Sequence, residues 1–336
     1  MNKPNVLVTG GAGFIGSHVV DQCIANNFNV IVLDDLSGGF KENINPHALF
    51  IKGSVTDYNL VNTLFIEYNF KFVYHLAAYA AEGLSHFIRR FNYNNNLVGT
   101  VNLINASINT GSVERFVFTS SIAVYGAGQV PMTEELTPIP EDPYGIAKYA
   151  MELDLKSALH LHGLNYTIFR PHNVYGERQN IADRYRNVIG IFMNQIMKDE
   201  ELTVFGDGTQ TRAFSHVDNV APIIASCVFN DQAKNEVFNI GAEKPYTIIR
   251  LAEIIGTCFN KTPKINFLDA RQEVVHAFSD HKKLERVFGK QTYIDLEIGI
   301  KKMTDWAIAV GPQEPSIFEN IEVPLNMPPS WAKFVK

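Results

Sequence analysis

Short apolar runs alternate with longer amphipathic stretches along the first half of the chain. Six runs are apolar at nearly every position, as strands covered on both faces of a sheet require: Val6–Thr9, Val30–Leu33, Leu49–Ile51, Phe72–His75, Phe116–Thr119 and Tyr166–Phe169. Four stretches between them have the period of amphipathic helices: Phe14–Asn26, Tyr58–Tyr68, Asn94–Thr110 and Tyr144–His162. This alternation predicts consecutive βαβ units, and therefore a Rossmann-type, doubly wound parallel sheet over residues 1–170.

The pattern becomes shorter and more mixed after Arg170. We expect a smaller C-terminal α/β lobe there, built from residues 171–212 and 242–311, which holds the substrate. Ala221–Asn230 has helix character and Val237–Ile240 has strand character, so a segment of about 213–241 is expected to return to the sheet. Five prolines follow Gly311 and predict a loosely packed surface extension over residues 312–336.

Composition narrows the classes of function. The chain has 336 residues, and 29 Lys and Arg stand against 35 Asp and Glu, for a net charge of −6. Since no five-residue basic block occurs, a nucleic-acid partner is not expected. The three cysteines have no CxxC spacing, and no run approaches the ~18 apolar residues of a membrane-spanning helix. We therefore expect a cytoplasmic protein that needs no membrane partner.

A glycine turn follows the first predicted strand and opens the first predicted helix, with the sequence Gly10-Gly11-Ala12-Gly13-Phe14-Ile15-Gly16. Gly10 and Gly13 permit a tight turn and a close approach to a pyrophosphate, and Gly16 lets the helix pack on the strand. The start of the helix adds N–H groups and the positive end of its dipole. The turn therefore predicts a dinucleotide site.

Acidic residues after the next two strands refine this prediction. Asp34 ends the second strand, where a carboxylate accepts from the adenosine ribose hydroxyls and repels a 2′-phosphate. Asp35 follows it, and no Lys or Arg comes before Lys41, which favours NAD over NADP. The alternative is that both acids are solvated loop residues. Asp57, after the third strand, is either an adenine contact or a helix N-cap.

Tyr144 and Lys148 lie four residues apart at the start of a predicted helix, so their side chains share one face. A tyrosine phenol has an ordinary pKa near 10, and an adjacent ammonium together with a nicotinium ring favours its phenolate. Ser120 and Ser121 close the fifth strand, at the edge where open α/β sheets bind ligands. Together these residues predict a hydroxyl beside a tyrosine base.

Four further motifs accompany these features: Leu76-Ala77-Ala78, Asn95–Thr100, Ser120–Gly126 and Pro143–Lys148. In combination they resemble the extended short-chain dehydrogenase/reductases, and among them the nucleotide-sugar epimerases of the UDP-glucose 4-epimerase type. The resemblance covers roughly residues 4–310. It implies that Ser121, Tyr144 and Lys148 are catalytic.

The same resemblance implies further contacts and an assembly. The implied cofactor contacts, besides Tyr144 and Lys148, are Gly10, Gly13, Phe14, Ile15, Gly16, Asp34, Asp35, Asp57, Leu76, Ala77, Ala78, Asn96 and Ser120. It also implies a homodimer, in which Asn94–Thr110 and Tyr144–His162 pair with the same helices of a second subunit as a four-helix bundle.

The residues after Ser121 separate the reactions within this family. Related 4,6-dehydratases carry an Asp-Glu pair there and the decarboxylases carry a Glu, whereas this chain has Ile122-Ala123. Because elimination then lacks its acid and base, the prediction is a 4-epimerase. Tyr144 takes the proton of a sugar hydroxyl, NAD accepts the hydride, and the 4-keto sugar turns over before both return.

Resemblance also assigns residues to the substrate lobe. Asn173 matches a diphosphate contact, and Asn187 and Val188 match a segment that lines the base. Arg212 and Arg271 match two arginines that clamp phosphate oxygens, a role that suits a bidentate guanidinium. These matches favour a UDP-hexose, as the hexose, N-acetyl or uronate form.

A gate position in the family precedes Ser279-Asp280, where a small residue admits an N-acetyl group. One register places Ala277 there, and a register shifted by one residue places Phe278 there and reverses the conclusion.

Three alternatives remain open. GDP-mannose 3,5-epimerase is similar in His172–Gly176, but it has a Cys where this chain has Ala123 and a Lys where only Arg184 and Arg186 are near. A guanidinium is a poor proton shuttle. The others are a catalytically silent NAD-binding regulator and a dehydrogenase that releases NADH.

No metal site is predicted from the histidines. His160 and His162 diverge on the surface of a helix, and His276 and His281 lack further ligands at suitable spacing. We expect His276 and His281 to be surface residues.

Overall fold

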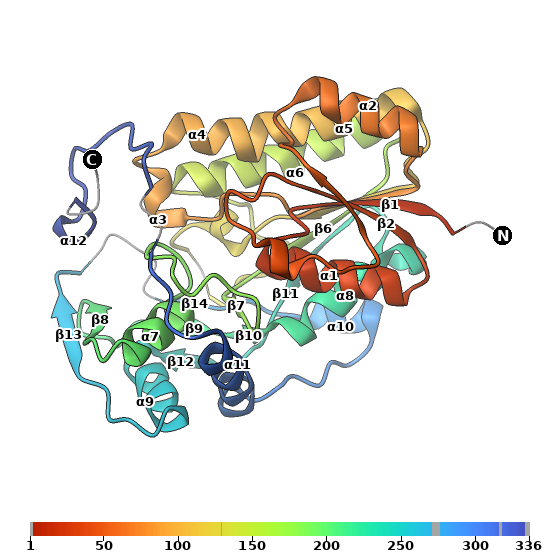
Figure 1. Cartoon of the computed structure of the whole chain (residues 1–336). Helices are drawn as coiled ribbons and strands as arrows, with labels where there is room; N and C mark the ends of the chain where they lie inside the picture. The colour runs from red at the N-terminus through yellow and green to blue at the C-terminus, as the bar shows by residue number, and fades with distance from the viewer. Residues whose placement is uncertain (1–2, 129, 271–275, 316–317, 333–336) are drawn as a thin grey trace.

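A parallel sheet forms the centre of the protein in a computed structural model that describes residues 3–128, 130–270, 276–315 and 318–332 (Figure 1). Seven strands of these described ranges build it: β1 (Asn5–Thr9), β2 (Asn29–Asp34), β3 (Leu49–Lys52), β4 (Phe72–His75), β5 (Arg115–Thr119), β6 (Tyr166–Pro171) and β11 (Glu236–Ile240). Their order is β11-β6-β5-β4-β1-β2-β3, and every neighbouring pair is parallel. The predicted Rossmann-type α/β fold is confirmed.

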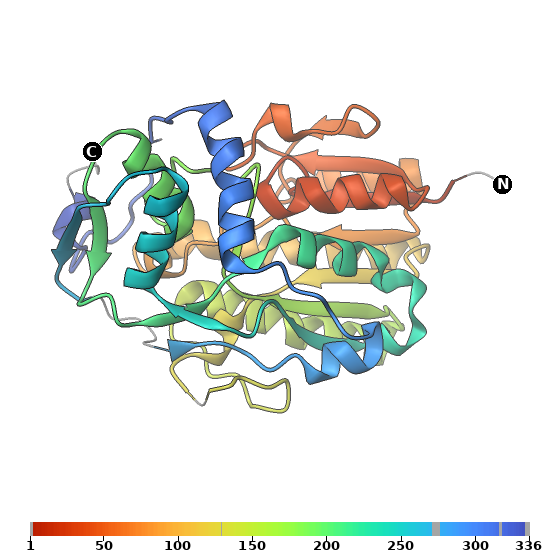
Figure 2. The same ribbon diagram turned by 90° about the horizontal axis from the view of Figure 1, so that it is seen from below.

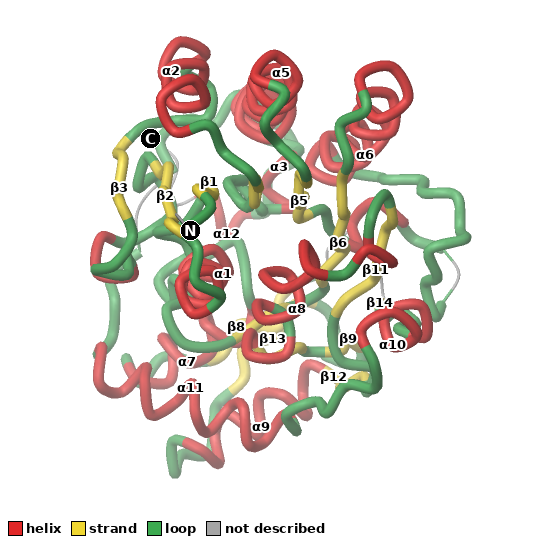
Figure 3. The backbone as a smooth tube through the Cα atoms, turned by 90° about the vertical axis from the view of Figure 1, so that its right-hand side faces the viewer, coloured by secondary structure: helices red, strands yellow, loops and turns green. Residues whose placement is uncertain are grey.

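Helices cover both faces of this sheet, as Figure 3 shows along the strands. One face carries α2 (Tyr58–Tyr68), α5 (Gly99–Thr110) and α6 (Pro143–His162), and the other carries α1 (Phe14–Ala25) and α8 (Ala221–Ser226). Val20 of α1 and Leu155 of α6 are among the fully buried side chains of the two resulting cores. Burial on both faces explains why the strands are apolar at nearly every position.

The order of the strands reverses beside β1, because β2 follows β1 on one side and β4 lies on the other. Ligands of open α/β sheets bind at such a switch point, outside the carboxyl ends of the strands. The glycine turn after β1 lies at this edge.

A second lobe lies beyond that edge, and Figure 2 shows its helices beside the carboxyl ends of the strands. Its elements are β7 (Val174–Tyr175), α7 (Val188–Met197), β8 (Leu202–Phe205), β9 (Thr211–Ala213), β10 (Ser215–His216), β12 (Pro245–Thr247), α9 (Ile248–Cys258), β13 (Ile265–Leu268), β14 (His276–Ala277) and α11 (Leu296–Val310). Phe192, Leu251 and Ile300 belong to its separate apolar core. The short helix α10 (Lys282–Phe288) instead packs against the sheet through Leu284.

Two predicted segments differ from the structure. The helix expected over Asn94–Thr110 is preceded by α4 (Arg89–Tyr93), and its first turn, Asn94–Val98, is a π-helix that leads into α5. The predicted helix Ala221–Asn230 is α-helical only as far as Ser226. In the described ranges no helix is both long and apolar enough to cross a membrane.

The expectation of a loosely packed C-terminal extension is wrong for part of it: most of its described residues are exposed or half-buried, but its two described aromatic residues pack into an apolar cluster. Trp331, in α12 (Pro329–Ala332), is buried and packs with Leu84 of α3 (Glu82–Ser85) and with Phe318 in one apolar cluster. The proline content indicated an irregular backbone, but Phe318, which is partly buried, and Trp331, which follows the last proline and is buried, pack into this cluster.

Candidate active site

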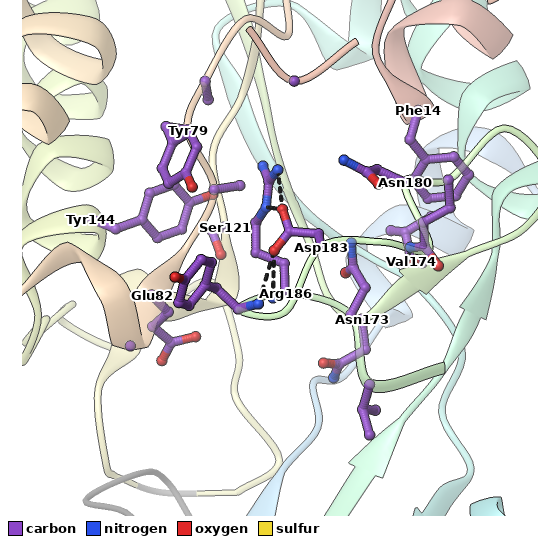
Figure 4. A pocket seen from close by; sticks show the side chains of 18 of the residues that line it. Phe14, Tyr79, Glu82, Ser121, Tyr144, Asn173, Val174, Asn180, Asp183 and Arg186 are labelled. Atoms are coloured by element: carbon purple, nitrogen blue, oxygen red, sulfur yellow. Dashed lines mark hydrogen bonds and ion pairs between the residues drawn. The ribbon is translucent and has the colours of Figure 1, made fainter. Parts of the chain in front are cut away.

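A cavity of about 700 Å³ lies between the carboxyl edge of the sheet and the second lobe. Figure 4 shows that side chains from both parts of the chain point into it, among them Tyr144 from α6 and Asn173 from the loop after β6. Parallel strands deliver their carboxyl ends to one edge, so loops that are distant in sequence meet there.

The glycine turn is packed as a pyrophosphate cradle requires. A side chain at Gly10, whose φ is 71°, would place its Cβ 2.6 Å from the amide nitrogen of Ala77. A Cβ at Gly16 would lie 2.0 Å from the Gly10 carbonyl oxygen. No side chain caps the start of α1 at Gly13, so its first N–H groups remain for a ligand. The residues present fit NAD.

Asp34 is held at the adenosine side of this cradle. One carboxylate oxygen accepts from the Ala12 N–H at 3.0 Å and the other from the Leu36 N–H at 2.8 Å, while burial raises the pKa of Asp34. Each oxygen keeps a second lone pair for a ribose hydroxyl. Asp35 also lines the cavity. Asp57 does not: its carboxylate caps α2 by accepting from Leu60 N–H at 3.0 Å.

Leu76, Ala77 and Ala78 line the cavity after β4. Asn96 is not among the lining residues; it is fully buried and acts on the backbone of the loop. Its Oδ1 accepts from the Tyr79 N–H at 2.8 Å, and its Nδ2 donates to the Tyr79 carbonyl at 3.1 Å. Asn96 therefore fixes the backbone at Tyr79, which lines the cavity.

Ser121, Tyr144 and Lys148 come together at the inner end of the cavity. Burial raises the pKa of Tyr144, and a hydrogen bond with Ser121 lowers it in part. Lys148 Nζ donates to the Thr119 carbonyl at 2.8 Å and lies 5.9 Å from the centre of the Tyr144 ring. Burial lowers the pKa of Lys148 to about 7.

A buried polar network lies behind this trio. The Ser120 hydroxyl donates to the Glu152 carboxylate at 2.6 Å, and Glu152 pairs bidentately with Arg170 at 2.9 and 2.5 Å. Arg170 donates in turn to the Tyr125 hydroxyl at 2.6 Å. Because Ser120 also lines the cavity, this network fixes the strand end that presents the neighbouring Ser121. Glu152 and Arg170 lie on different elements, so sequence spacing did not reveal the pair.

The residues expected at the substrate line the other wall of the cavity: Asn173, Asn187, Val188, Arg212 and Ala277. Arg212 and Ala277 are register partners on the parallel strands β9 and β14. Phe278 is not among the lining residues, since neighbouring side chains of an extended segment point to opposite sides. Arg271 lies outside the described residues.

The expectation that His281 is a surface residue is wrong. It is fully buried, and its Nε2 lies 3.1 Å from Nε2 of His172, which lines the cavity. Burial lowers the pKa of His172 to about 4 and that of His281 to about 3. His276 is exposed on β14. Among the described residues no group of three or more His, Cys, Asp or Glu side chains is arranged to hold a metal.

Many lining residues were not predicted as site residues, among them Tyr79, Asp183 and Arg186. Asp183 and Arg186 lie three residues apart before α7 and form an ion pair. Their spacing was the available signal, but a pair of this kind is usually an ordinary surface contact. The three-dimensional fold is what places this pair in the wall of the cavity.

Comparison with known proteins agrees with this geometry. The sequence model of the NAD-dependent epimerase/dehydratase family matches residues 6–241, which include the glycine turn and the trio. The chain belongs to this family. This epimerase/dehydratase is 38% identical over 307 residues to a Methanocaldococcus jannaschii protein, a match that covers 90% of this chain and 97% of that protein. The resemblance to extended short-chain dehydrogenase/reductases is thereby confirmed, and the cofactor is NAD.

Two solved structures are similar to this family member over nearly their whole length. UDP-glucose 4-epimerase of Thermotoga maritima with UDP-glucose has a TM-score of 0.86 and 35% identity, covering 90% of this chain and 98% of that one. UDP-N-acetylglucosamine 4-epimerase of Methanobrevibacter ruminantium, in complex with UDP-N-acetylmuramic acid, has a TM-score of 0.85 and 32% identity. That match covers 92% of this chain and 100% of the other.

Proposed function

We propose that this enzyme inverts C4 of a UDP-hexose through a transient 4-keto sugar. The observation that carries the proposal is the composition of the inner end of the cavity. Ser121 and Tyr144 meet there, while Ile122 and Ala123, which also line the cavity, fill the positions where family dehydratases carry their acid and base. The site therefore has one proton-transferring phenol and no carboxylate at those two positions.

Tyr144 is the base in this proposal. Its phenolate removes the proton of the C4 hydroxyl, and Ser121 donates a hydrogen bond to the C4 oxygen. Bound NAD supplies the hydride acceptor, and later the hydride donor. Lys148 keeps a positive charge near the phenol and so favours its ionised form. After the keto sugar has turned over, Tyr144 returns the proton to the C4 oxygen as the hydride returns to the opposite face of C4.

The substrate wall supports a nucleotide diphosphate sugar. Arg212 lines the cavity and supplies a guanidinium suited to phosphate oxygens. Asn173 has a φ of 41°, in the left-handed region, and donates from Nδ2 to the Ala213 carbonyl at 3.2 Å. This bond orients the amide at the cavity wall. The UDP-sugar substrates in the names of the two solved relatives support uridine as the base.

The size of the gate favours a substrate range that includes N-acetylhexosamines. Ala277 is buried and lines the cavity, whereas Phe278 is absent from the lining among the described residues. A methyl group at this position leaves room for an acetamido group on the sugar.

A substrate panel in deuterated water tests the proposal. The purified protein is incubated with UDP-glucose, UDP-galactose, both N-acetyl forms, UDP-glucuronate and GDP-mannose, and the products are followed by NMR. We expect interconversion at C4 of at least one UDP-sugar pair, without deuterium at carbon. Tyr144→Phe should lower kcat by about 10²–10⁴-fold, the usual contribution of a proton-transferring residue, while NAD remains bound.

Other outcomes distinguish the alternatives. Deuterium at C3 and C5 of GDP-mannose identifies a 3,5-epimerase, and net formation of free NADH identifies a dehydrogenase. Activity that is unchanged in Tyr144→Phe, or no C4 inversion of any UDP-sugar in the panel, contradicts the proposal.

A further inference from the structure

Arg186 reaches the cofactor side of the cavity from the opposite lobe. It precedes α7, yet its side chain is 17% exposed and lines the same cavity as the glycine turn. Figure 4 shows Arg186 and Asp183 between Tyr79 and Tyr144 on one side and Asn173, Asn180 and Phe14 on the other. The long side chain therefore crosses the groove.

Local contacts fix the direction of this side chain. Arg186 Nε donates to Asp183 Oδ2 at 2.6 Å. Asp183 is itself held, because its Oδ1 accepts from the N–H groups of Tyr185 at 2.8 Å and Arg186 at 3.2 Å. The guanidinium carbon lies 4.7 Å from the centre of the Tyr79 ring. The ion pair and the aromatic ring together hold the charged group in place without a ligand.

The far end of the guanidinium lies beside the loop after β2. A Cβ built on Gly38 would be 3.7 Å from Arg186 Nη2. This loop runs along the glycine turn: a Cβ on Gly39 would be 2.6 Å from the Ala12 carbonyl carbon, and the Phe40 N–H donates to the Ala12 oxygen at 3.0 Å. Arg186 Nη2 therefore borders the pyrophosphate cradle.

The charges around the glycine turn indicate a role for the Arg186 guanidinium. A dinucleotide brings two negative charges to a place where Asp34 and Asp35 already lie. Among the described residues between Gly10 and His86 that line the cavity, none is a Lys or an Arg. The first turn of α1 offers only N–H groups and a helix dipole equivalent to roughly half a charge. The guanidinium near Gly38 comes from the other lobe, at Arg186, and in the cofactor-free protein Asp183 balances its charge.

We propose that Arg186 binds the pyrophosphate of NAD, with Asp183 as its positioning residue. The substrate lobe thereby retains the cofactor during a cycle that uses NAD without releasing it. Asp183 takes the N–H of Nε and one N–H of Nη2, so the second N–H of Nη2 and both N–H groups of Nη1 remain as donors for a phosphate oxygen. This inference depends on the NAD site and not on the identity of the sugar.

Binding measurements on the full chain test the proposal without reference to turnover. Arg186→Met is stripped of NAD and titrated calorimetrically with NAD, ADP-ribose and adenosine. We expect about 10–100-fold weaker binding of both pyrophosphate ligands, because a hydrogen bond to a charged group contributes about 1.5–3 kcal/mol, and unchanged binding of adenosine. The fraction of NAD that co-purifies, measured by chromatography after denaturation, should fall in parallel.

Two further variants make the result specific. Arg186→Lys keeps the charge without the fork and should recover part of the lost affinity. Arg178→Met removes the same charge from the same segment, at a side chain paired with Asp21 and absent from the cavity lining, and should bind NAD as the unmodified protein does. Thermal unfolding confirms that each variant is folded.

Affinities for NAD and ADP-ribose within twofold of the unmodified protein overturn the proposal. An equal loss of adenosine affinity also overturns it, because the effect would then lie in the shape of the groove. If Arg186→Met does not fold, the same criteria apply to Arg186→Lys. Failure of the sugar panel leaves these binding results unaffected, so the two proposals fail separately.

Discussion

At the residue scale, Tyr144, the base in the proposed reaction, lies in surroundings that oppose its own ionisation. Burial raises the pKa of Tyr144, whereas the Ser121 hydrogen bond and the charge of Arg186 lower it. Lys148, with a pKa lowered to about 7, supplies only part of a charge near neutral pH in the cofactor-free protein. We therefore expect the positive nicotinamide ring of bound NAD to supply the remaining stabilisation of the phenolate, which couples the proposed base strength to cofactor binding.

The proposed gate for the sugar is a single residue, Ala277. Ala277→Tyr places a bulky ring where the cavity now has a methyl group, beside Arg212 in the register of β9 and β14. We expect kcat/KM for UDP-N-acetylglucosamine to fall by about tenfold or more, because a packed site does not absorb the added volume of the ring. The kcat/KM for UDP-glucose should change by less than about threefold. Steady-state assays with both substrates measure the ratio. Equal losses for both sugars would contradict the gate assignment, and Ala277→Ser is the matched control of similar size.

Sequence reasoning found the residues whose chemistry is local, such as the glycine turn and the Tyr144 and Lys148 pair on one helix. It did not identify Arg186 as a candidate cofactor contact. The loop that the Arg186 side chain approaches is at Gly38, more than a hundred positions earlier in the chain. His281 was misjudged for the same physical reason: its partner, His172, comes from another element. The surroundings of such residues depend on contacts between segments that are distant in the sequence, and residue spacing does not predict these contacts.

At the element scale, α6 has two roles. Its inner face carries Tyr144, Lys148 and Glu152, while Ile146 and Leu153, seven residues apart on another face, are 39% and 48% exposed. Residues at this spacing form an apolar stripe on a helix. The stripe supports the proposal of a homodimer in which α5 and α6 meet their copies.

Leu153→Asp tests this assembly. A charge at the centre of the apolar stripe should convert the dimer to a monomer, because a buried unpaired carboxylate strongly disfavours association. Light scattering coupled to size exclusion measures the mass of the particle. Ile66→Asp, at an exposed position of α2 on a different helix, is the control and should remain dimeric. A monomeric unmodified protein contradicts the proposed dimer.

The histidine pair joins the loop after β6 to the segment after β14. His172 Nδ1 donates to the Ala213 carbonyl at 3.2 Å, so its Nε2 accepts from Nε2 of His281, and both rings are neutral. Their folded pKa values, about 4 and about 3, lie below the unfolded value of 6.5. The unfolded chain therefore binds more protons as pH falls below 6.5. Stability is fully present above that pH and decreases toward the folded values.

This linkage predicts a steep acid response. Between pH 6 and pH 4.5 each buried histidine should remove about 1.4 kcal/mol of unfolding free energy per pH unit. Urea unfolding at several pH values measures the slope, and His281→Gln should reduce it by about one histidine's share. His160→Gln, at an exposed position near the end of α6, is the control for replacing a histidine outside the buried pair. Equal slopes for His281→Gln and the unmodified protein would show that the pair does not titrate in this way.

At the scale of the whole molecule, the fold was predictable where burial follows a simple period. The strands start and end within a residue or two of their predicted bounds, since a sheet covered on both faces demands continuous apolar runs. The C-terminal extension was not predictable in this way. Its aromatic residues have no periodic pattern, and they are buried only because α3 and α4 offer apolar surface to them.

That extension links the two lobes. After α11 of the second lobe, the chain returns to the cofactor lobe (Figure 1). Glu322 accepts from the N–H groups of Arg90 and Phe91 at 2.6 and 2.8 Å. Trp331 packs edge-on against Tyr185 at 5.1 Å between ring centres and lines the cavity. The extension is therefore part of the cavity wall.

Trp331→Ala tests whether this wall matters for function. The cavity left by the indole should lower the unfolding free energy by about 3–5 kcal/mol. The loss is smaller if the extension detaches from the rest of the protein at a lower free-energy cost. In both cases, protease cleavage after Gly311 should accelerate. KM for the UDP-sugar should rise by a larger factor than kcat falls, because the substrate loses part of its enclosure while the surroundings of Tyr144 stay unchanged. Leu325→Ala, in the same extension but 74% exposed, is the matched control. If both variants resist protease equally and keep the same KM, the extension supports the fold alone and takes no part in enclosing the substrate.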